Sequence, residues 1–229
     1  GAGPYVITGT TTTNHIVVSG GSGVTSDITL NGVNIQSNDH SAMIIMNNSK
    51  VNLTISGINI INSGADNAGL GVSMGSEVTI MGGSADSLNA TGGYRGAGIG
   101  GGYQETVGMI TISSGIVTAQ GGTQAAGIGG GADRNGWTIT ISGGTIITTG
   151  GDNGAGIGGG YSGNGGTTTI SGGTVITQGG ISGAGIGGGY IGVGGATTIS
   201  GGKIITQGGN FGAGIGGGYL GVGGATTIS

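Results

Sequence analysis

The sequence contains no cysteine and one proline, and charged side chains make up only 5% of its 229 residues. Without cysteine, neither disulfide bonds nor thiolate metal sites can stabilise the fold. Only four residues are basic and the formal net charge is −4, which excludes the basic surface that a nucleic-acid partner requires. The sequence also lacks a run of about 18 apolar residues, so we predict no membrane span.

Glycine is abundant instead, with 66 residues. Glycine in regular structure costs roughly 0.5–1 kcal/mol relative to alanine, so this content requires compensation from cooperative contacts. Valine, isoleucine and leucine recur at fixed positions between the glycine clusters, and the collagen pattern of glycine at every third position is absent. This combination favours an ordered repeat protein over a disordered chain.

One hexapeptide, Ala-Gly-Ile-Gly-Gly-Gly, occurs five times at a constant spacing of 29 residues. Its copies begin at Ala97, Ala126, Ala155, Ala184 and Ala213. Each unit also contains a Thr-rich and a Val/Ile-rich run, and strands this short gain stability only by stacking on neighbouring units. The sequence therefore predicts an all-β fold, a right-handed parallel β-helix (β-solenoid) with three short strands per coil, 29 residues per coil and about eight coils.

The N-terminal part has a looser version of the same organisation. Leu30, Ile55 and Ile80 follow one another at intervals of 25 residues, within short β-favouring runs. We expect residues 1–95 to form irregular coils and a cap, continuous with the regular repeats of residues 96–229 in one domain. Because the sequence stops directly after the second strand of a coil, we expect the chain to continue there or to dock on another molecule.

Three aliphatic ladders are predicted to fill the core, because alternate residues of a strand face the same side. Burial of each aliphatic side chain contributes roughly 1.5–3 kcal/mol, which offsets the cost of the glycines. The ladders consist of Ile99, Ile128, Ile157, Ile186 and Ile215; of Ile112, Ile141, Ile170, Ile199 and Ile228; and of Val117, Ile146, Val175 and Ile204.

The tandem Ala-Gly-Ile-Gly-Gly-Gly units, followed by Thr-rich and Val/Ile-rich strands, resemble the glycine-rich right-handed parallel β-helix segments of large bacterial surface and secreted proteins. The resemblance is specific in residues 96–229 and looser in residues 10–93. It implies an extracellular or cell-surface location and a role as a stalk, an adhesin or a carbohydrate-binding module. It supplies no catalytic residue.

A column of tyrosines is the first candidate for recognition. Four tyrosines follow a Gly-Gly-Gly, and Ala132 replaces tyrosine in one intervening coil. A flat aromatic ring can stack on a sugar, and stacked tyrosines can equally stabilise a corner of the solenoid without a ligand. The column consists of Tyr103, Tyr161, Tyr190 and Tyr219.

A second candidate is a ladder of outward threonines, which presents hydroxyl and methyl groups at regular intervals. Such an array can order water, as in ice binding, although threonine is also a common exposed strand residue. Thr138 and Thr167 extend the ladder sideways, and Ala196 and Ala225 interrupt that second column. The ladder consists of Thr111, Thr140, Thr169, Thr198 and Thr227.

A third candidate is an assembly surface. We expect Gly98 and Gly100 and their equivalents to point outward, where a strip without side chains lets another backbone approach closely. An outward aliphatic column, Ile147, Ile176 and Ile205, adds an apolar strip of the kind that marks contacts. Both features favour lateral self-association or packing against further domains of the same chain.

Catalysis, cofactors and metals find little support. The acidic residues fall in differing turns, and residues 153–229 contain none, whereas polysaccharide hydrolysis requires gathered carboxylates. His15 and His40 lie about one coil apart, which predicts neighbours in exposed turns more readily than a metal pair. We therefore expect no enzyme, no cofactor and no bound metal.

These observations favour a non-enzymatic, extracellular structural or adhesive β-solenoid that self-associates into a fibre or filament. The alternatives are a carbohydrate-binding module that uses the tyrosine column to bind polysaccharide, and an ice-binding protein that uses the threonine ladder.

Overall fold

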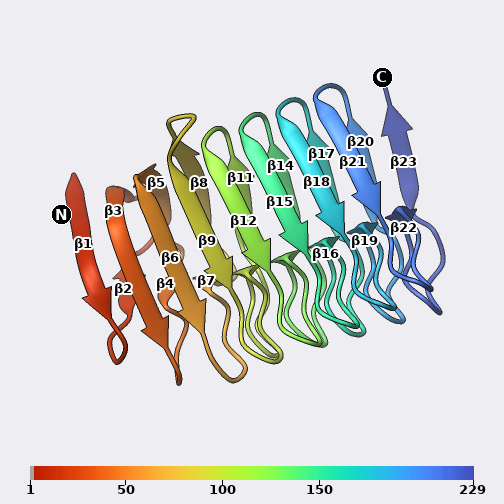
Figure 1. Ribbon diagram of the computed structural model, residues 1–229, viewed down its shortest axis with the longest axis horizontal. Helices are drawn as coiled ribbons and strands as arrows, with labels where there is room; N and C mark the ends of the chain where they lie inside the picture. Colours follow the sequence, from red (N-terminus) through yellow and green to blue (C-terminus); the bar gives the residue numbers. More distant parts are fainter. Residues whose placement is uncertain (1–2) are drawn as a thin grey trace.

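The computed structural model describes residues 3–229 and contains 23 β-strands in this range. The chain winds as a parallel β-solenoid, with the N-terminal and C-terminal strands at opposite ends of the long axis (Figure 1). Within the described range there is no helix that is long and apolar enough to cross a membrane. The all-β solenoid predicted from the repeat is thus confirmed.

Each coil places one strand on each of three faces, which we call A, B and C in chain order. Face A consists of β2 (Ile16–Ser19), β4 (Met43–Met46), β7 (Leu70–Val72), β10 (Ile99–Gly100), β13 (Ile128–Gly129), β16 (Ile157–Gly158), β19 (Ile186–Gly187) and β22 (Ile215–Gly216). Face B contains β5 (Lys50–Ser56), β8 (Glu77–Gly82), β11 (Met109–Ile112), β14 (Thr138–Ile141), β17 (Thr167–Ile170), β20 (Ala196–Ile199) and β23 (Ala225–Ile228). Face C contains β6 (Ile58–Ser63), β9 (Ser87–Thr91), β12 (Ile116–Gln120), β15 (Thr145–Thr149), β18 (Thr174–Gln178) and β21 (Lys203–Gln207).

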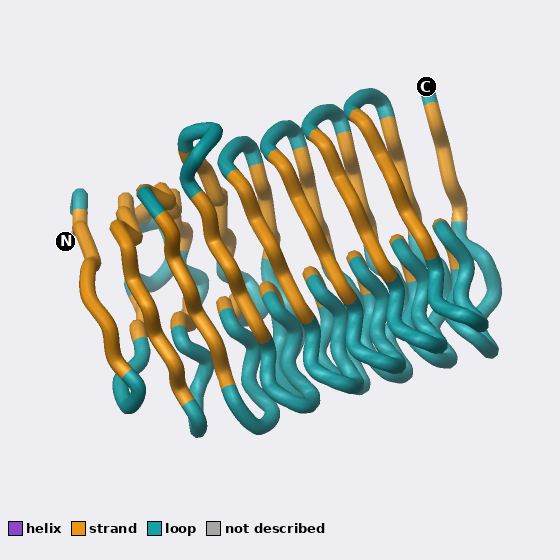
Figure 2. The backbone as a smooth tube through the Cα atoms, viewed as in Figure 1, coloured by secondary structure: helices purple, strands orange, loops and turns teal. Residues whose placement is uncertain are grey.

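Two long N-terminal strands join faces B and C into one 15-stranded sheet. β3 (Thr25–Ser37) pairs with β5 through its first half and with β6 through its second half, and β1 (Tyr5–Thr11) follows the same path. In later coils a tight turn separates the two faces, and its glycine, such as Gly115 (φ 89°), adopts a left-handed conformation. Figure 2 shows these turns along one edge and the long loops to and from face A along the opposite edge.

The three predicted core ladders are confirmed. Their members pair in register with the equivalent residue of the next coil on faces A, B and C. Ile99, Ile112 and Val117 are each fully buried, as are their equivalents in the following coils. Only the last coil differs, because Ile228 has no further coil to cover it and is 71% exposed.

The predicted register of the N-terminal coils is partly wrong. Leu30 pairs with Ile55 as expected, but Ile80 pairs with Leu53 instead of Ile55, so that step is 27 residues and not 25. A shift of two residues keeps every side chain on the same face of the strand, because the side-chain period is two. Hydrophobic alternation alone therefore could not distinguish the two registers.

The hexapeptide forms a narrow arch whose isoleucine points into the core. In each regular coil the N–H of its alanine donates to the carbonyl four residues later, as from Ala97 to Gly101 (2.9 Å). A Cβ on Gly98 would lie 2.7 Å from the backbone nitrogen of Gln120, and one on Gly100 would collide with the carbonyl of the next coil. Both glycines are buried. The prediction that they form an outward assembly surface is therefore wrong, because this glycine wall packs against backbone inside the molecule.

Candidate carbohydrate-binding surface

The loops from face A to face B bring three of the four predicted tyrosines into one stack. The ring centroids of Tyr161 and Tyr190 lie 5.4 Å apart at an angle of 10°, and those of Tyr190 and Tyr219 lie 5.7 Å apart at 28°. Phe211 packs edge-on against Tyr219, with 5.0 Å between centroids. The faces of Tyr190 are thus covered on both sides. The column presents ring edges and hydroxyls outward, and its central ring offers no open face for a sugar.

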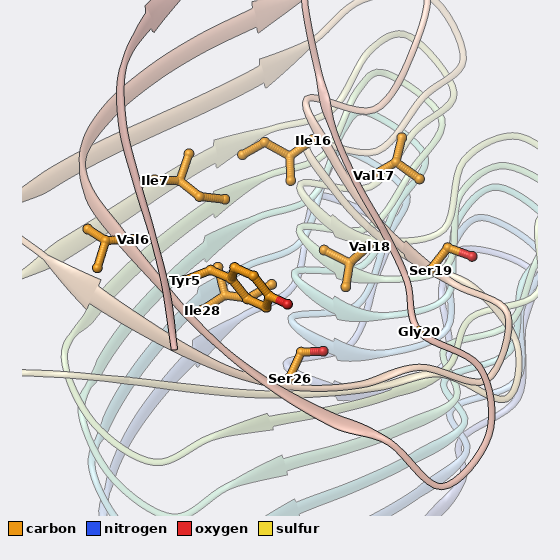
Figure 3. A pocket seen from close by; sticks show the side chains of 10 residues that line it. All are labelled: Tyr5, Val6, Ile7, Ile16, Val17, Val18, Ser19, Gly20, Ser26 and Ile28. Carbon is orange, nitrogen blue, oxygen red and sulfur yellow. The ribbon is translucent and has the colours of Figure 1, made fainter. Parts of the chain in front are cut away.

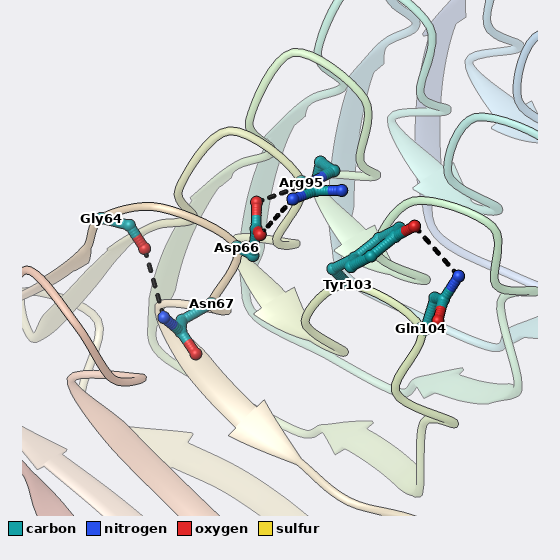
Figure 4. A network of polar contacts seen from close by, with 6 residues as sticks. All are labelled: Gly64, Asp66, Asn67, Arg95, Tyr103 and Gln104. Atoms are coloured by element: carbon teal, nitrogen blue, oxygen red, sulfur yellow. Dashed lines mark hydrogen bonds and ion pairs between the residues drawn. The ribbon is translucent and has the colours of Figure 1, made fainter.

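Tyr103 is separated from this stack by the buried Ala132 and belongs to a different contact. The guanidinium of Arg95 lies 3.7 Å from the centroid of its ring. Arg95 also donates to Asp66 of the preceding coil through Nε (2.7 Å) and Nη2, and this hydrogen bond raises the pKa of the guanidinium above its ordinary value. Gln104 donates to the Tyr103 hydroxyl (Figure 4). These contacts cross-link neighbouring loops and leave Tyr103 with a structural role.

Trp137, the only tryptophan, is an exposed aromatic that the sequence analysis did not single out. It directly precedes β14, and its side chain is 48% exposed. Among residues 3–229 it has no stacked aromatic neighbour, and its indole N–H makes no hydrogen bond to them. In the adjacent coils its position is occupied by Gly108 and Gly166, because Met109, Thr138 and Thr167 pair in register directly after them. An indole between two glycines leaves space on both of its sides.

A hollow contacts Trp137 on each side along the solenoid. The hollow of about 250 Å³ toward the C-terminal coils is lined by Asn135, Thr138, Asn164 and Thr167. The hollow of about 280 Å³ toward the N-terminal coils is lined by Met74, Glu77, Gly108 and Met109. One hollow is thus rich in amides and hydroxyls, and the other combines two thioethers with one carboxylate.

The two asparagines of the polar hollow are held in fixed orientations. The side-chain oxygen of Asn135 accepts from the backbone N–H of Asn164 (2.8 Å), and that of Asn164 accepts from the N–H of Val193 (2.8 Å). Neither side-chain NH₂ group donates to another residue in the described part of the chain. Each asparagine therefore presents free donors at one-coil spacing, beside the exposed indole.

The threonine and isoleucine columns lie on different faces. The five threonines of the predicted ladder pair in register along face B, where the first three are half-buried and the last two exposed. Ile147, Ile176 and Ile205 form a continuous column on face C, with exposures of 37%, 37% and 48%. Both columns face outward, as the alternation of strand residues predicted.

The carboxylates of the described coils mainly serve structure. Glu77 pairs with Lys50 (3.0 Å), and Asp86 accepts from the backbone N–H groups of Gly57 and Gly83. No group of three or more His, Cys, Asp or Glu side chains in residues 3–229 is arranged to hold a metal ion.

The two histidines are neighbours across adjacent coils. The ring centroids of His15 and His40 lie 4.4 Å apart, at an angle of 38°. A ring pair without a third ligand provides no coordination sphere.

The largest hollow, about 430 Å³, lies between β1, β2 and β3 (Figure 3). Ile7, Ile16, Val18 and Ile28 point into it, and Ser19 and Ser26 line its rim. Ile7, Ile16 and Val18 also pack against the main hydrophobic core. This hollow is an extension of the core and lacks the convergent polar groups that a sugar requires.

Two family descriptions match parts of the chain. A carbohydrate-binding domain-containing protein family matches residues 1–69, and a beta helix repeat family matches residues 110–132, 139–161, 169–190 and 198–219. No curated protein and no solved structure gives a significant match. The repeat matches follow the regular coils, and the other match covers the first coils, before Trp137 and the tyrosines. The chain is thus a parallel β-solenoid whose regular coils are similar to known β-helix repeats.

Proposed function

We propose that this chain is a non-catalytic, carbohydrate-binding β-solenoid of an extracellular or cell-surface protein, in which Trp137 is the platform for a sugar ring. The exposed, unstacked indole carries the proposal. The apolar face of a pyranose packs on such a ring, while its hydroxyls need donors and acceptors at the rim. Asn135 and Asn164 supply free donors there. The carbohydrate-binding match to residues 1–69 supports the same class of ligand.

The surroundings of Trp137 favour binding without turnover. Hydrolysis of a glycosidic bond uses two carboxylic groups that flank it. Glu77 is the only acidic residue among those that line the two hollows, and it is paired with Lys50. A site with one engaged carboxylate suits retention of a polysaccharide rather than its cleavage.

A screen of immobilised glycans with the whole chain tests this proposal, with affinity electrophoresis in soluble polysaccharides as confirmation. We expect saturable binding that W137A abolishes. Phe211 is a matched control, because it is also an exposed aromatic (58%) but lies in a loop away from the hollows. Absence of binding to every glycan, or equal binding by W137A and the native chain, would contradict the proposal.

A second candidate is a structural or adhesive role through lateral self-association, and the exposed isoleucine column on face C favours it. Sedimentation velocity at increasing concentration tests this idea. If the column forms the contact, I176K abolishes the association, whereas T169K, which places the same charge on face B, retains it. A native chain that stays monomeric at high concentration would rule the contact out.

A further inference from the structure

We infer that the ligand of the Trp137 site is a neutral, extended, β-linked glycan that lies along the solenoid axis, with successive sugars on successive coils. The inference rests on the proposed function and adds the orientation and the chemical class of the ligand. It follows from the arrangement of the two hollows, from the spacing of the coils and from the charges around the site.

The two hollows form one line across four consecutive coils. Glu77, Met109, Thr138 and Thr167 pair in register, one on each coil, and all four line one or the other hollow. Trp137 lies at the junction and contacts both. The long dimension of the site is therefore the stacking direction, perpendicular to the strands.

The spacing of the coils matches that of an extended sugar chain. Paired strands lie roughly 4.8 Å apart, so equivalent side chains recur at that interval along the line. An extended β-1,4-linked chain of pyranoses advances by a similar distance per sugar. Each sugar along such a chain then meets the same column of protein groups. Asn135 and Asn164 are such a column, with free NH₂ groups one coil apart.

The two halves of the line suit the two kinds of surface on a pyranose. Toward the C-terminal coils, the amides of Asn135 and Asn164 and the hydroxyls of Thr138 and Thr167 can bond sugar hydroxyls. Toward the N-terminal coils, Met74 (65% exposed) and Met109 (42% exposed) offer polarizable apolar contacts for ring C–H groups. Trp137 stacks on the sugar between them.

The charges around the line favour a neutral glycan over a uronate or sulfated one. No basic residue lines either hollow. Lys50 is paired with Glu77, and the guanidinium of Arg134, close in sequence, donates to the carbonyls of Gln104 and Asp133. A polyanion would thus meet a carboxylate and no free cation, so its desolvation would be uncompensated.

The fluorescence of Trp137 tests the inference, because the single tryptophan reports only on this site. The native chain is titrated with neutral β-1,4-linked oligosaccharides of increasing length and with oligogalacturonates of equal length. We expect the neutral series to change the emission, with an affinity that rises up to about four sugars, one for each coil of the line. The oligogalacturonates should bind at least about tenfold more weakly.

Variants at the two ends of the line complete the test. T167K should weaken binding of the tetrasaccharide by about tenfold, the loss of one sugar's contacts, and leave a disaccharide almost unaffected. A225K, in the same column two coils further on, should bind as the native chain does, and circular dichroism checks that both variants fold. Neutral glycan binding that is independent of length, or preference for the anionic series, would overturn the inference and leave the proposed function standing. If no glycan binds at all, the proposed function itself fails.

Discussion

The coils of residues 3–95 and those of residues 96–229 close their corners in different ways. In the N-terminal coils, polar side chains cap the backbone. Ser49 Oγ accepts from the N–H of Gly20 (2.7 Å), and the buried amide of Asn59 accepts from Val33 (3.1 Å) and donates to Ser87 (3.2 Å). Side-chain caps can reach over different distances, and these coils differ in length accordingly.

In the regular coils, backbone packs directly on backbone. The N–H of Ala126 donates to the carbonyl of Gly130 (3.0 Å), and a Cβ on Gly127 would lie 2.7 Å from the carbonyl oxygen of Gly156 in the next coil. Such contacts leave no room for a side chain or for an extra residue. The comparison teaches that the constant 29-residue spacing is a consequence of glycine packing, and that coils capped by side chains escape this constraint.

The largest effect should come from adding a methyl group to the glycine wall. We expect G127A to lower the free energy of unfolding by about 3 kcal/mol, because Gly127 is closely surrounded by backbone. G20A is the matched control in the N-terminal coils, where the nearest atom to a new Cβ is 3.7 Å away, so a change within about 0.5 kcal/mol is expected. Urea denaturation measures both. Equal losses in the two variants would remove the distinction between the two kinds of coil.

The next largest effect should come from removing a side-chain cap. N59A leaves the buried N–H of Val33 without its acceptor and should cost about 2 kcal/mol. Asn62, half-buried on the same strand, is the control, and N62A should change stability by less than about 0.5 kcal/mol. If N59A proves as mild as N62A, capping does not stabilise the N-terminal coils.

A smaller loss is expected when the tyrosine stack is interrupted. Y190A removes two stacked contacts, each of which contributes about 0.5–1.5 kcal/mol, so the unfolding free energy should fall by roughly 1–3 kcal/mol. Glycan binding should persist, because the faces of this ring are already covered. Loss of glycan binding in a folded Y190A protein would return recognition to the tyrosines.

The smallest effect should come from the surface of face B. T169K changes an outward side chain and should alter stability by no more than about 0.5 kcal/mol. Thermal denaturation measures the change. The same variant tests the ice-binding hypothesis, since thermal hysteresis in the native protein that T169K abolishes would assign the threonine ladder a function.

The sequence predicted the fold well where the repeat was constant and less well where it varied. The isoleucines of the hexapeptide were placed in the core correctly, because an invariant spacing leaves one register. Ile80 was paired with the wrong residue, because Leu53 and Ile55 both face inward and the hydrophobic pattern cannot separate them. Gly98 was placed on the surface because alternation was extended through the arch, where both sides of the backbone are enclosed.

The candidate site was harder to predict than the fold. Trp137 occurs once, between positions that are glycine in the neighbouring coils, so a search for repeated residues passed over it. The usable signal was its contrast with Gly108 and Gly166, which appears only after the coils are aligned. The tyrosines were conspicuous because they repeat, and the same repetition stacks them and covers the central ring.

The most direct test of the proposed recognition site combines two readouts on the native chain, retention in a gel that contains a neutral polysaccharide and the emission of Trp137 during titration with the same polymer. The account predicts that both change over the same range of concentration. Retention in the gel with unchanged tryptophan emission would show that the polysaccharide binds elsewhere and would contradict it.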